Sequence, residues 1–305
     1  MKITAVVVTF NRVEHVKKSI EQMLNLDYPP HEIVVVNNAS TDNTQAVLSE
    51  LCLHNPNIAV TTTIKNIGGA GGFAVGMKVA YDRGADFVWI MDDDAYAEPS
   101  SLKRLYESYS ILEQHGIKAG FICSKVNWTD GNICEMNQPG VSWDWMRRGN
   151  IIDSLVKVDS CSFVSCLIPR EVIDEVGLPM HEFFIWFDDM EYTKRISRVR
   201  ECFSDTKSIV VHAPVENRGV YFALVRKDTL WKYSYGARNE SWYRLHRDGI
   251  GHWLVFIASK LRDMSVGKVP YGIRWFIVKA IFAGAVSKFK VQDVDSFKLT
   301  NFIKL

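Results

Sequence analysis

Cysteine is sparse in this sequence of 305 residues, and its spacing shows no metal-binding pattern. There are six cysteines, and no two of them form a CxxC pair. The pattern argues against a zinc knuckle and against a dense disulfide framework. We therefore expect reduced thiols.

An excess of charge of either sign is also missing. Lys plus Arg total 36 and Asp plus Glu total 35, so no overall field attracts nucleic acid, and any recognition of phosphate must be local. We expect no nucleic-acid partner.

A secretion signal is the third missing feature. The opening MKITAVVVTFN has a short apolar run, without a basic segment followed by a long apolar segment and a cleavage site. We expect it to be a first strand and the protein to be cytoplasmic. The hydrophobic content of 47% is enough for a sizeable core.

The first third of the chain alternates between strand and helix patterns. Apolar β-branched runs typical of strands buried on both faces occur at residues 3–8, 32–36, 58–63 and 87–91. Helical spacing or capping residues indicate helices at 13–24, from 39–42 to about Leu53, and from 66–77 onward. This order predicts an open, mostly parallel α/β sheet flanked by helices, with a ligand site at the carboxyl ends of the strands.

The rest of the chain is less regular. We predict strands at 120–126, 160–168 and 208–211, short helices at 169–176 and 189–198, and long helices at 221–247, 252–263 and 271–290. The prediction is a sheet domain over residues 1–219, with a nucleotide-binding half (1–95) and an acceptor half (96–219). Residues 220–305 are expected to form a C-terminal helical extension.

The segment 271–290 combines an apolar face with basic residues. Lys279 interrupts the apolar run, so it falls short of the roughly 18 to 20 residues that cross a bilayer. Two interpretations remain, an amphipathic helix lying on a membrane surface and a helix packed on the protein. We favour the first, with peripheral association at the inner face of the cell membrane.

The strongest chemical signal is Asp92-Asp93-Asp94, directly after the apolar strand FVWIM. Three adjacent carboxylates repel one another, and a divalent cation held by Asp92 and Asp94 would compensate their charge. In an extended chain these two side chains would point to the same side. The alternative is a solvated acidic turn.

The second signal is FFIWFDDME at residues 183–191. Its apolar residues would place Asp188 and Asp189 at the edge of a low-dielectric pocket, where a raised pKa suits a general base. The alternative is an Asp that caps the following helix, with Glu191 favouring the helix dipole.

A histidine and a glycine-rich loop complete the candidate site. His212 follows an apolar strand, and one imidazole with two carboxylates is a reasonable ligand set for Mn²⁺ or Mg²⁺. The glycines at positions 68, 69, 71, 72 and 76 either let backbone approach a sugar diphosphate or serve close packing and tight turns. They match neither G-x-G-x-x-G nor the nucleoside-triphosphate loop.

Taken together, VVVTFNR, VVVNNASTDNT, KNIGGAGGF, DDD and FFIWFDDMEY with His212 resemble glycosyltransferase family 2, which has the GT-A fold; the match covers about residues 1–215. The resemblance implies inversion at the anomeric carbon, with Asp189 as base and Asp188 orienting a substrate. It implies Asp92, Asp94 and His212 as metal ligands, and Trp186 and Glu191 as acceptor contacts. Donor-binding residues would be Thr9, Asn11, Arg12, Asn38, Asn66, Gly68, Gly69, Gly71, Asp92 and Asp93. Asn38 stands where the family commonly has an Asp that reads uracil.

Within that family, the glycine loop most resembles galactofuranosyltransferases, which use UDP-galactofuranose on lipid-linked bacterial glycans. A rhamnosyltransferase that uses dTDP-rhamnose is the alternative. Arg238 and Asn239 could order the C-terminal helices or touch a lipid diphosphate, and we favour the structural role. Whether the chain forms a homo-oligomer stays open.

Two other classes of protein fit the sequence less well. A nucleotidyltransferase would normally have a basic glycine-rich loop after the first strand, and VVVTFNRVEH does not supply one. A catalytically inactive nucleotide- or glycan-binding relative would have no chemical need for Asp92, Asp94, Asp189 and His212 together.

Overall fold

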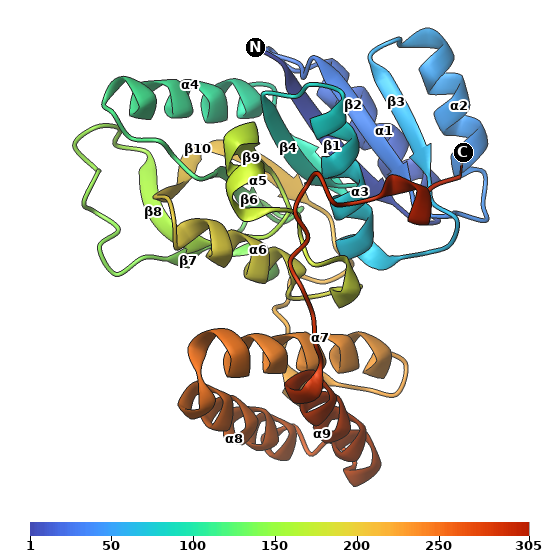
Figure 1. The fold of residues 1–305 in the computed structure, drawn as a ribbon, viewed down its shortest axis with the longest axis vertical. Coiled ribbons are helices and arrows are strands. Elements are labelled where there is room, and N and C mark those ends of the chain that lie inside the picture. The colour runs from blue at the N-terminus through green and yellow to red at the C-terminus, as the bar shows by residue number, and fades with distance from the viewer. Residues whose placement is uncertain (305) are drawn as a thin grey trace.

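The computed structural model describes residues 1–304 and contains a sheet domain and a smaller helical unit (Figure 1). The strands are β1 (Ile3–Thr9), β2 (Glu32–Asn37), β3 (Ile58–Thr62), β4 (Phe87–Asp92), β5 (Ala95–Ala97), β6 (Ile122–Asn127), β7 (Gly140–Val141), β8 (Leu155–Ser160), β9 (Cys166–Pro169) and β10 (Cys202–His212). The α-helices are α1 (Val13–Leu24), α2 (Thr44–His54), α3 (Gly68–Asp82), α4 (Ser101–Gln114), α5 (Arg170–Val176), α6 (Asp188–Ser197), α7 (Leu230–Tyr243), α8 (Ile250–Val266) and α9 (Tyr271–Val286). The shorter turns of helix are η1 (Glu135–Asn137), η2 (His181–Phe183), η3 (Phe222–Leu224), η4 (Arg244–Asp248) and η5 (Leu299–Asn301).

The N-terminal half of the sheet is parallel, as expected. Strands β3, β2, β1 and β4 lie side by side in this order, and all three pairings are parallel. Successive residues of β1 face opposite sides: Ala5 and Val7 join one apolar cluster, and Val6 joins the other. Because both faces are buried, the strand is apolar throughout. Helices α1, α2 and α4 cover one face, and α3, α5 and α6 cover the other.

The second half of the sheet is mixed. Strand β9 lies between β4 and β6 and is antiparallel to both, while β6 and β10 are parallel. The single strand predicted at 160–168 is two strands, β8 and β9, because residues 161–165 leave the edge of the sheet and return between β4 and β6. Ser165 has a positive φ of 62° at this return.

Helices α7, α8 and α9 form the helical unit, which lies beside one end of the sheet domain (Figure 1). Helix α9 packs closely on α7, because Gly284 leaves room for the backbone of Arg238. The predicted helix 221–247 is shorter as an α-helix, since η3 precedes it and η4 follows it. Within residues 1–304, none of the helices has the length and apolar character needed to cross a bilayer.

The tail, residues 287–304, differs from the predicted domain division. It leaves α9 and runs back along the sheet domain to β3 (Figure 1). There Ile303 bridges Thr63, and the amide of Lys304 donates to the carbonyl of Thr62 at 2.9 Å. Val294 and Phe297 are buried in the core beside α3 and α5. The tail is therefore part of the sheet domain, although the sequence placed it in the helical extension.

Candidate active site

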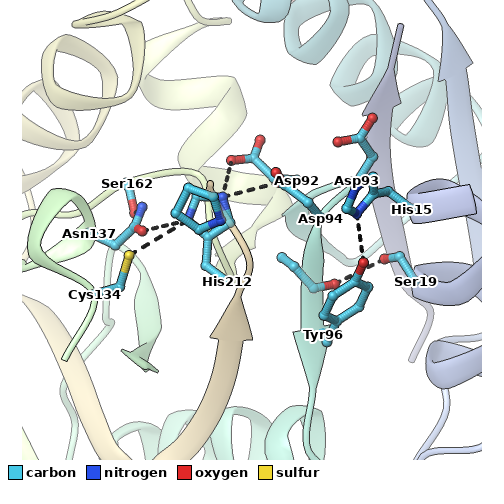
Figure 2. Close-up of polar contacts among 12 residues, drawn as sticks. His15, Ser19, Asp92, Asp93, Asp94, Tyr96, Cys134, Asn137, Ser162 and His212 are labelled. Carbon is cyan, nitrogen blue, oxygen red and sulfur yellow. Dashed lines mark hydrogen bonds and ion pairs between the residues drawn. The ribbon is translucent and has the colours of Figure 1, made fainter. Parts of the chain in front are cut away.

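Two carboxylates and one imidazole converge at the carboxyl end of β4. Ligand atoms of Asp92, Asp94 and His212 lie within 4.8 Å of one another. The Nε2 of His212 is 3.1 Å from a carboxylate oxygen of Asp94 and 4.0 Å from one of Asp92 (Figure 2). The predicted metal ligands are thus brought together.

The sheet explains why residues so far apart in sequence meet. The chain turns at Asp93 and Asp94 and returns as β5, which pairs antiparallel with the end of β10 and sets His212 opposite Ala95. The amide of Ala213 also donates to the carbonyl of Asp94 at 3.1 Å. Asp92 ends β4, while Asp93 and Asp94 form a turn, so the triplet is not an extended segment throughout. Asp93 and Asp94 are buried, so the alternative of a solvated acidic turn is wrong as well.

The ring of His212 is oriented by residues from an irregular segment. Its Nδ1 lies 2.7 Å from the side-chain oxygen of Asn137 and 3.8 Å from the sulfur of Cys134 (Figure 2). Because the Asn137 oxygen accepts a hydrogen bond, it assigns the proton to Nδ1 and directs Nε2 at the carboxylates. Burial lowers the pKa of His212, but the hydrogen bond to Asp94 and the nearby carboxylates outweigh it and raise that pKa to about 10.

Arg12 also compensates the acidic triplet. Its guanidinium lies 2.6 Å from Asp94 and 3.2 Å from Asp93, and the hydroxyl of Thr9 donates to Asp93 at 2.7 Å. We expected a metal ion to compensate the charge of the triplet, but Arg12 already compensates part of it. Burial raises the pKa of Asp94, but its bonds with His212 and Arg12 hold that pKa below the ordinary range.

Asp92 is the member of the triplet with the weakest compensation. Its side chain is 37% exposed and lines the cavity described below. Desolvation, together with Asp93, Asp94 and Asp189, outweighs His212 and raises the pKa of Asp92 to about 7. A divalent cation near Asp92, Asp94 and Nε2 of His212 would favour the charged carboxylate, so these residues fit a metal site.

Asp188 and Asp189, the acidic pair, begin α6. Phe187 is the N-cap residue of α6, so the alternative in which an Asp caps the helix is wrong. The pKa of Asp188 is well above its usual range because the carboxyl is buried beside Asp189. Burial raises the pKa of Asp189 to about 6, although the amide of Met190 donates to this carboxylate at 2.7 Å. With a pKa of about 6, Asp189 is mostly ionised at neutral pH.

The loop before the acidic pair has an unusual backbone that helix α7 supports. Phe184, Trp186 and Phe187 all have a positive φ, between 64° and 70°. Such conformations are unfavourable for residues other than glycine and persist where the surroundings enforce them. The fully buried amide of Asn239 donates to the carbonyls of Phe183, Ile185 and Trp186 at 2.8–3.1 Å.

Arg238 reinforces the same loop, since its guanidinium donates to the carbonyls of Glu182 and Phe183 at 2.8 and 3.1 Å. Arg238 and Asn239 therefore have a structural role, but their hydrogen bonds order this loop, whereas we expected them to order the C-terminal helices.

The glycine-rich loop serves mainly close packing. A Cβ on Gly72 would lie 2.4 Å from Val8, and one on Gly76 would lie 2.4 Å from Val6, so these glycines let α3 approach β1. Gly68 has a φ of 74° and lies against the carbonyl of Phe184, which joins this loop to the one that carries the acidic pair. Gly71 packs on Ile67. Gly69 lines the cavity and is free to approach a ligand.

Several predicted donor-binding residues do not line the cavity and instead order the loops next to it. The side chain of Asn38 is buried and bonds to Thr63, Asn66, the amide of Ile67 and the carbonyl of Gly68. This network uses the hydrogen bonds that an amide offers, so base recognition by Asn38 would require it to rearrange. Asn11, with a φ of 53°, links its loop to Ser40 and Thr41.

The two predicted acceptor contacts have different positions. Trp186 lines the cavity, where its ring packs edge-on against Tyr233 at 4.9 Å and lies over Gly236. Glu191 is 1% exposed, pairs with Arg195 at 2.9 Å and lies outside the cavity lining. The position of Glu191 therefore argues against an acceptor contact.

One cavity of about 780 Å³ connects these groups. The metal-ligand candidates, Arg12, Gly69, Trp186 and both members of the acidic pair line it. Basic side chains from α6, α7 and α8 line it as well: Lys194, Lys232, Arg244 and Lys260. Sequence reasoning missed these four, Asn137 and Cys134. The four-residue spacing of Lys232, Gly236, Glu240 and Arg244 on one helix face was the available signal for the basic group.

The likeness of this fold to solved structures defines its class. A structure of GalNAc-T7 with UDP, GalNAc and Mn²⁺ aligns with a TM-score of 0.58 at 13% identity, covering 81% of this chain and 49% of that one. A structure of residues 1–349 of S. aureus TarS aligns with a TM-score of 0.56 at 18% identity, covering 94% and 81%. At these identities the likeness concerns the fold, which is an α/β fold of the GT-A type.

Sequence comparison defines the family. The model described as Glycosyl transferase family 2 matches residues 4–177, more than half of the chain. The chain therefore belongs to glycosyl transferase family 2.

Several curated relatives are distant. Galactofuranosyltransferase GlfT1 of Mycolicibacterium smegmatis is 29% identical over 215 residues, covering 64% of this chain and 65% of that protein. GlfT1 of Mycobacterium tuberculosis is 28% identical over 214 residues, with 64% of each chain covered. Beta-monoglucosyldiacylglycerol synthase of Synechocystis is 26% identical over 212 residues, covering 68% and 42%. The chain spans just under two thirds of the length of the GlfT1 proteins.

Proposed function

We propose that this glycosyltransferase is metal-dependent and inverting, and that it transfers galactofuranose from UDP-galactofuranose to a lipid-linked bacterial glycan. The observation that carries the proposal is the shared cavity: the Asp92–Asp94–His212 group and the acidic pair open into the same space. A donor diphosphate and an acceptor hydroxyl could therefore meet there.

A divalent cation, Mn²⁺ or Mg²⁺, fits the acidic end of the cavity. Asp92, Asp94 and Nε2 of His212 would hold it, with Asn137 fixing the imidazole. Such a cation would neutralise the negative charge that develops on the leaving diphosphate. Arg12 lies beside the same carboxylates and would contribute a further positive charge.

The acidic pair supplies the proton acceptor. Asp189 is ionised at neutral pH and lines the cavity, so it can accept the proton of the acceptor hydroxyl. Burial beside Asp189 raises the pKa of Asp188 and favours its protonated form, which can donate a hydrogen bond that orients a sugar hydroxyl. With one displacement and no covalent intermediate, the anomeric configuration inverts.

The donor sugar is proposed from the relatives. GlfT1 proteins of two species match 64% of this chain under the name galactofuranosyltransferase. dTDP-rhamnose is the alternative donor.

The helical unit offers a surface for a membrane. Large apolar side chains are exposed on α8 and α9: Ile250, Leu254, Val255, Val266, Tyr271, Trp275, Phe276, Phe282 and Val286. Exposed basic residues accompany them, among them Arg262, Lys268 and Lys279. Exposed aromatic and basic residues on neighbouring helices suit the interface of an anionic bilayer. We propose peripheral binding to the inner face of the membrane, where a lipid-linked acceptor would be presented.

A thermal-shift screen tests the donor and the metal together. UDP, UDP-galactofuranose, UDP-galactopyranose, UDP-glucose, dTDP and dTDP-rhamnose are each added with Mn²⁺ and with EDTA. A ligand that binds the native state raises Tm by mass action. We expect Mn²⁺-dependent stabilisation by UDP and UDP-galactofuranose, followed by transfer to a galactan acceptor.

Any other outcome of this screen would change the proposal. Stabilisation by dTDP compounds alone would move the donor to rhamnose. Binding of UDP without transfer to any acceptor would favour an inactive relative, and no response to any nucleotide would refute the donor assignment.

A further inference from the structure

Four basic side chains gather where α6, α7 and α8 face the cavity. Lys194 comes from α6, Lys232 from α7, Arg244 from the turn after α7, and Lys260 from α8. We call these four residues the basic end of the cavity. On α7 the lining residues recur every four positions, so they form one stripe along the helix.

The acidic partners in this part of the cavity are shared. One carboxylate, that of Glu240, lies 3.1 Å from Arg244 and 3.7 Å from Lys260. Arg244 also pairs with Asp248 at 2.9 Å. Within residues 1–304, the ammonium groups of Lys194 and Lys232 have no carboxylate oxygen within 4.0 Å. The basic end therefore carries excess positive charge.

Lys194 sits in an unfavourable place for a cation. It is more than half removed from solvent, and burial together with Arg244 lowers its pKa. A lysine that is desolvated beside another cation gains most from a bound anion. Lysine and arginine side chains are well suited to phosphate oxygens, which accept several charge-assisted hydrogen bonds.

The position of these residues indicates which phosphate they would bind. A donor diphosphate already has partners at the acidic end, in the metal-ligand candidates and Arg12. The basic end instead belongs partly to the helical unit, whose outer surface exposes Leu254, Trp275 and Phe276. A phosphate that links a glycan to a lipid would have its charge in the cavity and its chain at this apolar surface.

We propose that Lys194, Lys232, Arg244 and Lys260 bind a phosphate or diphosphate ester on the acceptor, at the junction between its glycan and its lipid. This rests on the proposed function in one respect, since it assigns the anion to the acceptor. The binding step itself requires no sugar transfer and is tested separately.

The binding test uses inorganic diphosphate, farnesyl diphosphate and farnesol, all in EDTA so that no divalent cation bridges diphosphate to the acidic end. Titration followed by tryptophan fluorescence gives each Kd. The test variant is Lys194→Gln with Lys232→Gln, and the control is Lys17→Gln with Lys118→Gln, two exposed lysines outside the cavity lining.

We expect wild type and control to bind both diphosphates, farnesyl diphosphate more tightly, and the test variant to bind at least about ten-fold more weakly. Conservative replacement by Lys194→Arg with Lys232→Arg should retain binding, because the charge is kept. An unchanged Kd in the test variant would overturn the proposal. So would wild-type binding of farnesol as tight as that of farnesyl diphosphate, or tighter binding of inorganic diphosphate than of the lipid ester.

A kinetic comparison then assigns the anion to the acceptor. With one donor, KM is measured for a diphosphate-lipid glycan and for the octyl glycoside of the same glycan. The test variant should raise the first KM at least about ten-fold more than the second. A rise in donor KM with both acceptor values unchanged would overturn the assignment. If no donor supports transfer by wild type, the proposed function fails, and the Kd values alone decide whether the basic end binds phosphate.

Discussion

The two acidic groups of the cavity differ in how their charge is compensated. The triplet at the end of β4 has Arg12, Thr9 and His212 beside it. The acidic pair at the start of α6 has backbone amides and burial instead, and its pKa values are raised. The paired Asp94 thus stays charged to low pH, whereas Asp189 exchanges a proton near pH 6; Asp92, the least compensated member of the triplet, resembles Asp189 in this respect.

The largest expected effect comes from removing the base. Asp189→Asn should lower kcat by about 10²–10⁴-fold, which is the range of general-base contributions. UDP binding with Mn²⁺ should be retained, as measured by thermal shift. Asp188→Asn is the matched comparison: because burial raises the pKa of Asp188 and favours its neutral form, an amide resembles it more closely and the loss should be smaller. Full activity of Asp189→Asn would remove the base assignment.

Replacing a metal-ligand candidate tests the other acidic group. Asp94→Asn should weaken Mn²⁺-dependent binding of UDP by at least about 100-fold, because loss of a residue that only supports a metal ligand already costs about 10–100-fold. Isothermal titration with and without Mn²⁺ measures this, with the exposed Asp295→Asn as control. Equal loss of metal-dependent and metal-independent binding would mean that Asp94 acts on the nucleotide loops and not on a metal.

The pH dependence of sugar transfer tests the raised pKa of Asp189. Because the pKa of Asp189 is about 6 and the base must be ionised, kcat/KM should fall about ten-fold per pH unit well below pH 6. The profile should be level from about pH 7 upward until another group titrates. Measurement over pH 4.5–8 at saturating Mn²⁺ checks this. A rate that is constant down to pH 5 would contradict the raised pKa.

Asn239 of α7 supports the loop of the acidic pair. Removing its side chain should therefore affect the acidic pair and spare the triplet. Asn239→Ala leaves the carbonyls of Ile185 and Trp186 without their side-chain donor, while that of Phe183 keeps Arg238, and each unsatisfied buried group costs about 1–3 kcal/mol. We expect a lower Tm and a several-fold lower kcat, with Mn²⁺-dependent UDP affinity close to wild type. A parallel loss of UDP affinity would show that the two groups are not independently supported.

The smallest effect concerns stability. The folded-state pKa of Asp189 is raised to about 6 from about 3.9 in unfolded chains, so its ionisation destabilises the fold progressively as pH rises from about 4 to 6. At about 1.4 kcal/mol per pH unit, the loss is at most about 3 kcal/mol. Asp189→Asn should therefore have a Tm a few degrees above wild type at pH 7.5, and no advantage at pH 4. Calorimetry at both values tests the sign.

Sequence patterns located the sheet and the acidic residues well, because local periodicity and strand ends determine them. Helix α1 has the predicted bounds, and β1, β2 and β4 each extend one residue beyond them. Contacts between distant segments could not be predicted in this way. The pairing of Arg12 with Asp93 and Asp94 spans 81 and 82 residues, and that of His212 with Asn137 spans 75. A single sequence carries no signal for such partners.

Other misjudged residues had several physically reasonable roles. Glu191 follows the acidic pair and was expected at the acceptor, yet the face of α6 on which it lies turns it toward Arg195. The sequence did not show whether the glycine cluster serves ligand approach or close packing. The atoms next to each glycine Cα distinguish the two roles, and they are known only from the structure. The tail has no strong periodicity, so its return to β3 was invisible in the pattern.

The return of the tail also limits how the enzyme can open. A unit joined to a domain by a single chain connection can rotate freely about it. A unit joined by two connections can tilt but cannot move far from the domain. Residues 213–229 lead into the helical unit, and the tail leads out and is fastened at β3. The cavity that α7 lines should therefore widen by only a small tilt of the helical unit. For the acceptor proposed above, the entrance to the cavity would then have a nearly fixed width.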